Sequence, residues 1–316
     1  MRSVNSTSSV PSVVFGTVVA DGKKLVCFET LTKVSTGKTV AEHKDLGDES
    51  QTLSTVKASI GTSAKDGASG TQVIVPDDEM TIVDKVEYRN LFADGREYTV
   101  EGALQLVTID ENGNATAEPL TDSEGNPVTA KTAFTPDTPH GFVDVTFKFD
   151  GLKLEDGQKL VCFEKVSRNG SVLASHEDAS DEGQTVVTAL PKIGTTLTDA
   201  ADGDKDIVSN NPVKLTDTVS YAGLVPGREY TVTGTLYKKV ADGDGFEAVA
   251  VKDAEGNPVT AKTTFTPEKA NGTVDVAFEF DGSELAHGDE VVAFESLDRK
   301  GVELAAHADA PQSAYL

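Results

Sequence analysis

The sequence of 316 residues has no tryptophan, only two cysteines and no apolar run long enough to cross a bilayer. Cys27 and Cys162 lie in two copies of the segment LVCFE, and a third copy, VVAFE, has Ala293 at this position. Because equivalent positions of neighbouring domains rarely come within bridging distance, we expect no disulfide. Both cysteines are expected to be small, buried apolar side chains.

Positive charge is also scarce, since 28 lysine and arginine residues stand against 52 aspartate and glutamate residues. The formal net charge of −24 would repel nucleic acid and anionic membrane surfaces, so we expect no nucleic-acid partner and no membrane insertion. The first residues, MRSVNSTSSVPS, lack the apolar core of a signal peptide, and the C-terminal APQSAYL shows no anchor. The chain is therefore expected to be either intracellular or an excerpt of something longer.

Long internal repeats are what the sequence does contain. Residues 124–136, EGNPVTAKTAFTP, return almost unchanged at 255–267, and GREYTV occurs at both 95–100 and 227–232. The repeating unit is therefore a whole domain and not a solenoid turn. The predicted parts are a disordered tail at 1–11, the C-terminal part of an incomplete repeat at 12–56, a complete repeat at 57–190, and a repeat at 191–316 truncated before its last strand.

The periodicity inside each repeat is that of β-strands. Segments such as FVDVTFKF at 142–149 and TVDVAFEF at 273–280 alternate apolar with polar residues, and turn sequences such as ADGR, ENGN and RNG separate such segments. We find no convincing amphipathic helix. The prediction is an all-β fold, with tandem immunoglobulin-like β-sandwich domains in a row, joined by short linkers.

A few reactive residue types recur at fixed positions of the repeats. Histidine and glutamine stand at either end of HEDASDEGQ, as His176 and Gln184, and the same spacing separates His43 from Gln51. The candidate residues are Thr62, Asp84, Glu164, His176 and Gln184 in the second repeat, Thr195, Asp217, Glu295 and His307 in the third, and Glu29, His43 and Gln51 in the first.

These side chains have the chemistry for one reaction within the chain. A threonine hydroxyl becomes a nucleophile when a base such as histidine takes its proton. A buried carboxylic acid that a neighbouring carboxylate keeps protonated can polarise a carboxamide, and Asp84 and Glu164 are candidates for such a pair. Attack of Thr62 on the side-chain carbon of Gln184 would expel ammonia and leave an ester.

The segments HEDASDEGQTV, VCFE or VAFE, and IGTS or IGTT together resemble the Thr–Gln ester-bond domains (VaFE-repeat domains) of Gram-positive surface adhesins. The resemblance implies autocatalytic cross-linking of a first-strand threonine to a last-strand glutamine, in a single turnover and without a cofactor or metal. It also implies stalk repeats of an extracellular, cell-wall-anchored parent protein. The expected partners are neighbouring repeats of the stalk, and a host surface ligand bound through domains absent from this chain.

The roles of the family's residues are assigned to this sequence position by position. Thr62, Gln184, His176 and Asp84 match the family's motif, whereas the assignment of Glu164 rests on the VCFE position alone. The nearby carboxylates Asp178 and Asp181 are interpreted as turn or surface residues that shape the loop.

The other two parts depart from the full pattern. At the spacing that leads from His176 to Gln184, His307 leads to Tyr315, and Gln312 comes three residues too early. The third repeat is therefore expected to stay uncrosslinked unless Gln312 substitutes. The part at 12–56 has no threonine strand, so the chain is expected to be an excerpt or an incomplete gene product, with an unpaired sheet edge in this part.

Three alternatives remain open at this stage. Threonine, histidine and carboxylates could form the site of a hydrolase that turns over, although their repetition favours a structural reaction. The acidic segment DAADGDKD at 199–206 could belong to a calcium- or carbohydrate-binding module, although a plain acidic turn fits it better. An immunoglobulin-like stalk with no cross-link would keep the same fold.

Overall fold

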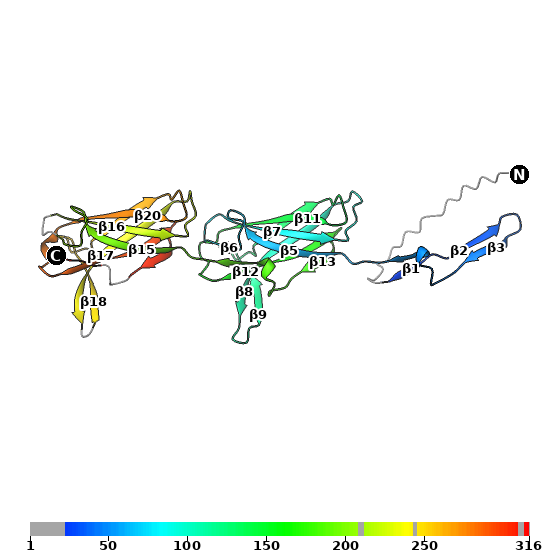
Figure 1. The fold of residues 1–316 in the computed structure, drawn as a ribbon, viewed down its shortest axis with the longest axis horizontal. Helices are drawn as coiled ribbons and strands as arrows, with labels where there is room; N and C mark the ends of the chain where they lie inside the picture. The colour runs from blue at the N-terminus through cyan, green and yellow to red at the C-terminus, as the bar shows by residue number, and fades with distance from the viewer. Residues whose placement is uncertain (1–22, 208–211, 243–244, 309–312, 316) are drawn as a thin grey trace.

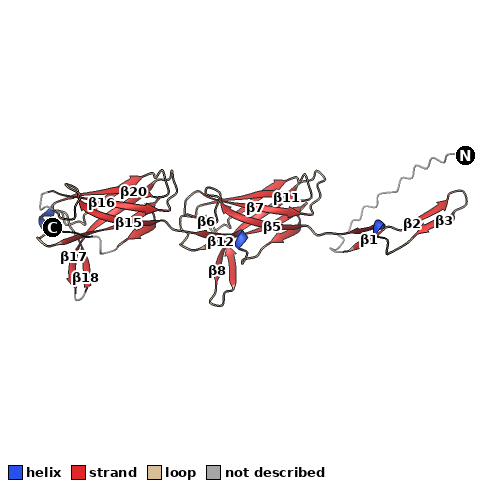
Figure 2. Cartoon of the chain, viewed as in Figure 1, coloured by secondary structure: helices blue, strands red, loops and turns tan. Residues whose placement is uncertain are grey.

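The computed structural model describes residues 23–207, 212–242, 245–308 and 313–315. Within these residues the regular structure is β-strand with three short 3₁₀ turns, which confirms the predicted all-β fold (Figure 2). Two β-sandwiches and a smaller piece made of two strand pairs follow one another along the long axis (Figure 1).

The second unit consists of two facing sheets. The smaller sheet has the antiparallel order β11 (Gly141–Phe149), β7 (Met80–Arg89), β5 (Ser59–Asp66). The larger sheet has the path β10 (Thr129–Phe134), β8 (Tyr98–Ile109), β12 (Lys159–Arg168), β14 (Thr185–Thr188), β6 (Val73–Ile74), with β13 (Ser171–His176) also on β12 and β9 (Ala115–Pro119) on β8.

Strand β12 has an interrupted neighbour along one edge. Strand β14 pairs with its first half, where Val161 lies opposite Thr185, and β13 pairs with its second half, where Glu164 lies opposite His176. The chain between β13 and β14 leaves the ladder and forms the short turn η2 (Glu182–Gln184). This interruption brings the end of β13 and the start of β14 beside the middle of β12.

Successive side chains of a strand point to opposite faces of the sheet, and this alternation determines which polar groups are buried between the sheets. On β7, Met80, Ile82, Asp84, Val86 and Tyr88 all point inward and are buried. A carboxyl group therefore occupies one position of an otherwise apolar row. An acid at such a position is costly to bury unless its charge is removed or compensated.

The core between the sheets is close-packed around aromatic side chains. A Cβ at Gly102 on β8 would lie 2.6 Å from Phe147 of the opposite sheet, and a Cβ at Gly234 would lie 2.6 Å from Phe278 in the third unit. Only glycine fits at such an approach, so the repeated glycine–phenylalanine contact is part of how each sandwich closes.

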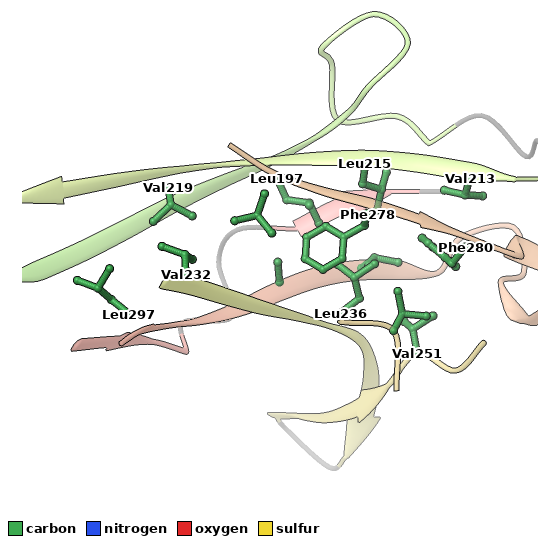
Figure 3. Packing of buried hydrophobic residues seen from close by; sticks show 14 of the residues in the cluster. Leu197, Val213, Leu215, Val219, Val232, Leu236, Val251, Phe278, Phe280 and Leu297 are labelled. Carbon is green, nitrogen blue, oxygen red and sulfur yellow. The ribbon is translucent and has the colours of Figure 1, made fainter. Parts of the chain in front are cut away.

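The third unit repeats this plan. One sheet has the order β15 (Lys192–Asp199), β16 (Val213–Ala222), β20 (Gly272–Phe280), and its inner side chains pack against the other sheet in a single apolar cluster (Figure 3). The other sheet contains β18 (Gly245–Ala250), β17 (Tyr230–Asp242), β21 (Glu290–Arg299) and β22 (Val302–His307), with β19 (Thr260–Phe265) on β17 and β23 (Ser313–Tyr315) on β21.

Strand β23 differs from the expectation that this unit ends before its last strand. It pairs with β21 so that Ser313 lies opposite Val292, as Thr185 of β14 lies opposite Val161 of β12. The sequence-based count assumed a loop of constant length, whereas the chain between His307 and this strand is shorter than in the second unit.

The first part is a half-sandwich. Strand β1 (Lys24–Val26) pairs with β4 (Thr52–Ser54), and β2 (Glu29–Lys33) pairs with β3 (Lys38–His43), with η1 (Glu49–Gln51) before β4. These strands correspond to β12, β14 and β13 of the second unit. No sheet faces them within the described residues, so apolar side chains such as Phe28 and Leu31 are exposed. Cys27 is exposed for the same reason, and the expectation that it is buried is wrong.

Candidate functional site

Two carboxyl groups face each other between the sheets of the second unit. Asp84 comes from β7 and Glu164 from β12, and neither has any exposed surface. A carboxyl oxygen of each lies within 4.8 Å of the other and of the Cys162 sulfur. Within the described residues, none of the four carboxyl oxygens receives a hydrogen bond of normal geometry, so two ionised groups would be poorly compensated.

A shared proton resolves this conflict. Burial raises the pKa of Asp84, against the opposing effects of hydrogen bonds with Glu164 and Thr62. Burial, and after it the hydrogen bond and the charge of Asp84, raise the pKa of Glu164 to about 11. At neutral pH Glu164 is therefore a carboxylic acid, which can donate a hydrogen bond.

Thr62 approaches this pair from the first strand of the unit. Strand β5 pairs with β7 so that Ala64 lies opposite Asp84, and Thr62 shares the inward face of Ala64. Its hydroxyl is buried, lies beside both carboxyl groups, and has no hydrogen bond of normal geometry within the described part of the chain. A buried hydroxyl that makes no well-formed hydrogen bond indicates a reactive position more than a structural one.

Gln184 enters the same region from the other end of the unit. It ends η2, is completely buried, and follows Gly183, at which an added Cβ would lie 3.5 Å from the carbonyl oxygen of Thr62. Strand β5 also packs against β13, β14 and η2. The side-chain oxygen of Gln184 is buried and has no hydrogen-bond donor among the described residues.

His176 contacts the amide of Gln184. The Gln184 Nε2 atom lies 2.9 Å from His176 Nδ1, and His176 Nε2 lies 3.2 Å from Asp181 Oδ2. An amide nitrogen only donates, so Nδ1 accepts its hydrogen and the neutral ring carries its own proton on Nε2, toward Asp181. The imidazole thus lies directly beside the nitrogen that would leave.

The sequence indicates a turn or surface role for Asp181, and the structure adds a contact with His176. Its Oδ1 accepts the backbone N–H of Gly183 at 2.7 Å and caps η2, while Oδ2 faces the imidazole of His176. In the first part, Asp48 lies 2.9 Å from His43 in the same way. The signal in the sequence was an aspartate three residues before the glutamine in both copies. The carboxylate of Asp178, by contrast, accepts hydrogen bonds from Ser180, as a turn residue does.

The third unit contains the same acid pair. Asp217 and Glu295 are buried, and Leu197 lies opposite Asp217 on the strand that carries Thr195, which is also buried. Burial raises the pKa of Asp217, and burial followed by the hydrogen bond and charge of Asp217 raises that of Glu295 to about 10. His307 lies opposite Glu295, as His176 lies opposite Glu164.

The register of β23 changes the assignment of the glutamine in this unit. Tyr315 lies opposite Glu290, as Val187 lies opposite Lys159, so Tyr315 does not hold the position of Gln184. Gln312 lies outside the described residues. In the sequence it directly precedes Ser313, as Gln184 directly precedes Thr185, so the objection that it comes too early does not hold.

The first part has the same strand pairing as the second unit, but among the described residues no facing sheet encloses its candidate side chains. Glu29 lies opposite His43, and Gln51 ends η1, but Glu29 and His43 are exposed. Since no threonine strand faces them within the described residues, these three side chains do not form a complete site there.

The residues do not fit a metal centre. Asp84, Cys162 and Glu164 have suitable ligand types, but metal binding requires deprotonated ligands. Burial, with the charges of Asp84 and Glu164, raises the pKa of the Cys162 thiol well above its usual value. At 199–206, the carboxylates of Asp199, Asp202 and Asp204 each accept a backbone N–H, which is the part of turn residues.

The fold and this repeated set of side chains define a tandem β-sandwich protein with a buried threonine–acid pair–histidine–glutamine site. The chain belongs to the family of T-Q ester bond containing domains, which matches residues 2–55, 58–188 and 191–314. No curated protein matches the chain. In the described part of the chain, no helix has the length and apolar character needed to span a membrane.

Solved structures with similar folds include two crystal forms of a bacterial adhesin from Mobiluncus mulieris containing intramolecular disulfide, isopeptide and ester bond cross-links. Both are 17% identical to this chain. One has a TM-score of 0.31, with 77% of this chain and 81% of that chain covered, and the other 0.32, with 78% and 83% covered. Red sea bream transglutaminase, 12% identical, has a TM-score of 0.28, with 78% of this chain and 30% of that chain covered.

Proposed function

We propose that the chain forms stalk repeats of a bacterial surface adhesin and that its second unit joins Thr62 to Gln184 by an intramolecular ester. The observation that carries the proposal is the site itself, in which a buried hydroxyl, a buried amide, a buried acid pair and a half-buried imidazole from five segments converge. Membership in the T-Q ester bond family supports the same chemistry.

The reaction balances within these groups. The Thr62 oxygen attacks the side-chain carbon of Gln184 while His176 accepts the hydroxyl proton. The protonated Glu164, supported by Asp84, donates a hydrogen bond to the Gln184 oxygen as negative charge develops there. His176 then delivers the proton to the amide nitrogen that it already contacts, and ammonia leaves as the ester forms.

Intact-mass spectrometry tests this proposal. Residues 57–190 should weigh less than the sequence mass by one ammonia, and Thr62→Ala or Gln184→Ala should restore the full mass. The matched control is Ser63→Ala, because Ser63 lies on the opposite, exposed face of β5. A full mass for the unaltered unit would leave an uncrosslinked immunoglobulin-like stalk as the function.

The reaction is proposed to run once per unit, so the chain is not a turnover enzyme. Both reacting groups belong to the chain and are consumed in the product, and Gln184 and the acid pair are buried. Continuous hydrolysis of an added ester or amide, inhibited by Thr62→Ala, would contradict this point.

The setting of the chain follows from the same proposal. An ester between a threonine and a glutamine needs no oxidising compartment, which suits an extracellular, cell-wall-anchored stalk without paired cysteines. Neighbouring repeats are its immediate partners, and domains outside this chain would bind the host ligand.

A further inference from the structure

A cluster of charges joins the second unit to the third. The loop that precedes β7 carries Asp77, Asp78 and Glu79, and the facing end of the third unit carries Arg228, Arg299 and Lys300. Arg228 donates to Asp77 and to Glu79, both at 2.7 Å, and Arg299 donates to Asp77 at 3.1 Å. Arg299 and Lys300 both pair with Asp78.

The centre of this cluster is removed from water. Arg299 is 4% exposed and Asp77 is 5% exposed, so their pairing is little screened by salt. Desolvation offsets much of the Coulomb energy of such a pair, and its main effect is to penalise arrangements in which either charge is buried alone. The contact therefore acts on the relative orientation of the units more than on their stability.

An apolar contact lies beside the charges. Leu152, from the loop after β11, is buried in the hydrophobic cluster of the third unit, and the neighbouring Gly151 N–H bonds to the carbonyl of Asp77. A cleft of about 640 Å³ remains between the units, lined in part by Met80, Leu224 and Arg228. Apolar packing therefore leaves part of this junction open, and the charged residues Asp77, Glu79 and Arg228 also line the cleft.

In the second unit, the equivalent arginine has an acidic partner within its own unit. Arg168 corresponds to Arg299, and it pairs at 3.0 Å with Asp94 of its own unit and donates to Tyr98 at 2.9 Å. The third unit has Pro226 in place of Asp94, and within the described residues Arg228 and Arg299 form ion pairs only with acids of the second unit. The acids that compensate them come from the preceding unit.

The turn at Lys300 shows a second difference. Lys300 and Gly301 have φ values of 49° and 80°, and the equivalent turn of the second unit uses Asn169 and Gly170, at 51° and 76°. Asparagine tolerates the left-handed region well and lysine does not. The less favourable residue stands where an amino group reaches Asp78.

We propose that Asp77, Asp78 and Glu79 with Arg228, Arg299 and Lys300 form a directional, charge-coded joint that holds these two units in one fixed orientation. A unit that carries the acidic loop before β7 can bind the next unit along the chain when the arginines of that next unit have no acid of their own to pair with. By its sequence the third unit has Asn210, Asn211 and Pro212 in place of the acids, so it could not form this joint with a following unit of its own kind.

Residual dipolar couplings of the isotopically labelled full chain test the joint. In the unaltered protein one alignment tensor should fit the couplings of both units. The double variant Asp77→Asn, Asp78→Asn installs the residues of the third unit and should make two different tensors necessary. The control is Arg96→Ala, because Arg96 is the second unit's counterpart of Arg228 and pairs with Asp94 of its own unit.

Lys300→Asn provides a variant that is expected to fold, since asparagine suits the turn. It should leave the unfolding midpoint of the third unit unchanged or higher. The dipolar couplings of the two units should then require two different alignment tensors. Separate tensors in the unaltered chain, or one common tensor in both joint variants, would overturn the proposal. Neither result depends on whether an ester forms.

Discussion

The protonated acid pair is the feature on which the site depends at the scale of single residues. Within the described residues no lysine or arginine pairs with Asp84 or Glu164, and His176, opposite Glu164 on β13, contacts the amide of Gln184. Burial first, and then the hydrogen bond and charge of Asp84, keep the proton on Glu164. The same groups recur in the third unit, where burial also comes first among the causes.

A pH dependence of stability follows from this proton. The unfolded chain releases the Glu164 proton near its ordinary pKa of 4.5, whereas the folded unit keeps it up to about 11. Between these values the folded state binds more protons, so the free energy of unfolding falls as pH rises, by about 1.4 kcal/mol per pH unit for one proton.

Denaturant unfolding of residues 57–190 in a Thr62→Ala background measures this slope without the cross-link. Glu164→Gln should flatten the fall in unfolding free energy between about pH 5 and about pH 9. The exposed Glu118 provides the control, since Glu118→Gln should leave the slope unchanged. An equal slope in Glu164→Gln would show that another group holds the proton.

The second prediction at this scale concerns Asp181. Asp181→Asn keeps an oxygen that can cap η2 but removes the negative charge facing His176 Nε2. The ester should then form more slowly, on the order of 10²-fold, because the imidazole becomes a weaker base. Loss of ammonia, followed by mass spectrometry after refolding, gives the rate.

Asp178→Asn is the matched control for that experiment, since the Asp178 carboxylate bonds to Ser180 and makes no direct contact with His176 among the described interactions. In the Thr62→Ala background, Asp181→Asn should leave the unfolding midpoint unchanged, which separates positioning of the base from a structural role. An unchanged rate of ammonia loss in Asp181→Asn would remove Asp181 from the mechanism.

At the scale of elements, the interrupted edge strand explains how one sandwich can hold such a site. A continuous last strand would place alternate residues on fixed faces of the sheet. The break between β13 and β14 frees the intervening residues, and η2 directs Gln184 inward beside β5. The position of the glutamine is therefore set by the register of β14 on β12, more than by the length of the loop before β14.

That conclusion carries a prediction for the third unit. Strand β23 has the register of β14, and Gln312 precedes it directly, so we expect this unit also to lose ammonia. The mass of the full chain should then be lower by two ammonia molecules, and Gln312→Ala should reduce the deficit to one. Gln158→Ala, outside the site, should leave both losses in place.

At the scale of the whole molecule, the cross-link should add stability. An ester from Thr62 to Gln184 closes a loop of more than a hundred residues, for which chain entropy gives about 4–5 kcal/mol. Thr62→Ala should lower the free energy of unfolding of the second unit by this amount. Calorimetry of the full chain measures it, because the transition of the second unit should move while that of the third stays in place.

The fold class, and most of the side chains that the structure brings together, could be predicted from the sequence because the same segments and residues recur in each repeat. Alternating segments identify strands, and recurring residues such as Thr62 and Thr195 mark positions that the fold uses twice. The sequence was insufficient where a side chain has a role in the turn as well as in the site, as with Asp181. It was also insufficient for the junction, because Arg299 and Asp77 meet only when two units are placed end to end.

The positions of Thr62 and Gln184 have a mechanical consequence. Thr62 lies near the start of β5 and Gln184 directly before β14, so tension on the two ends of the unit would pass through the ester. The intervening residues, and with them nearly all of the sandwich, would bear none of the load. Such a unit cannot lengthen by unravelling or dissipate energy in doing so, and it behaves as an inextensible link instead of a shock absorber.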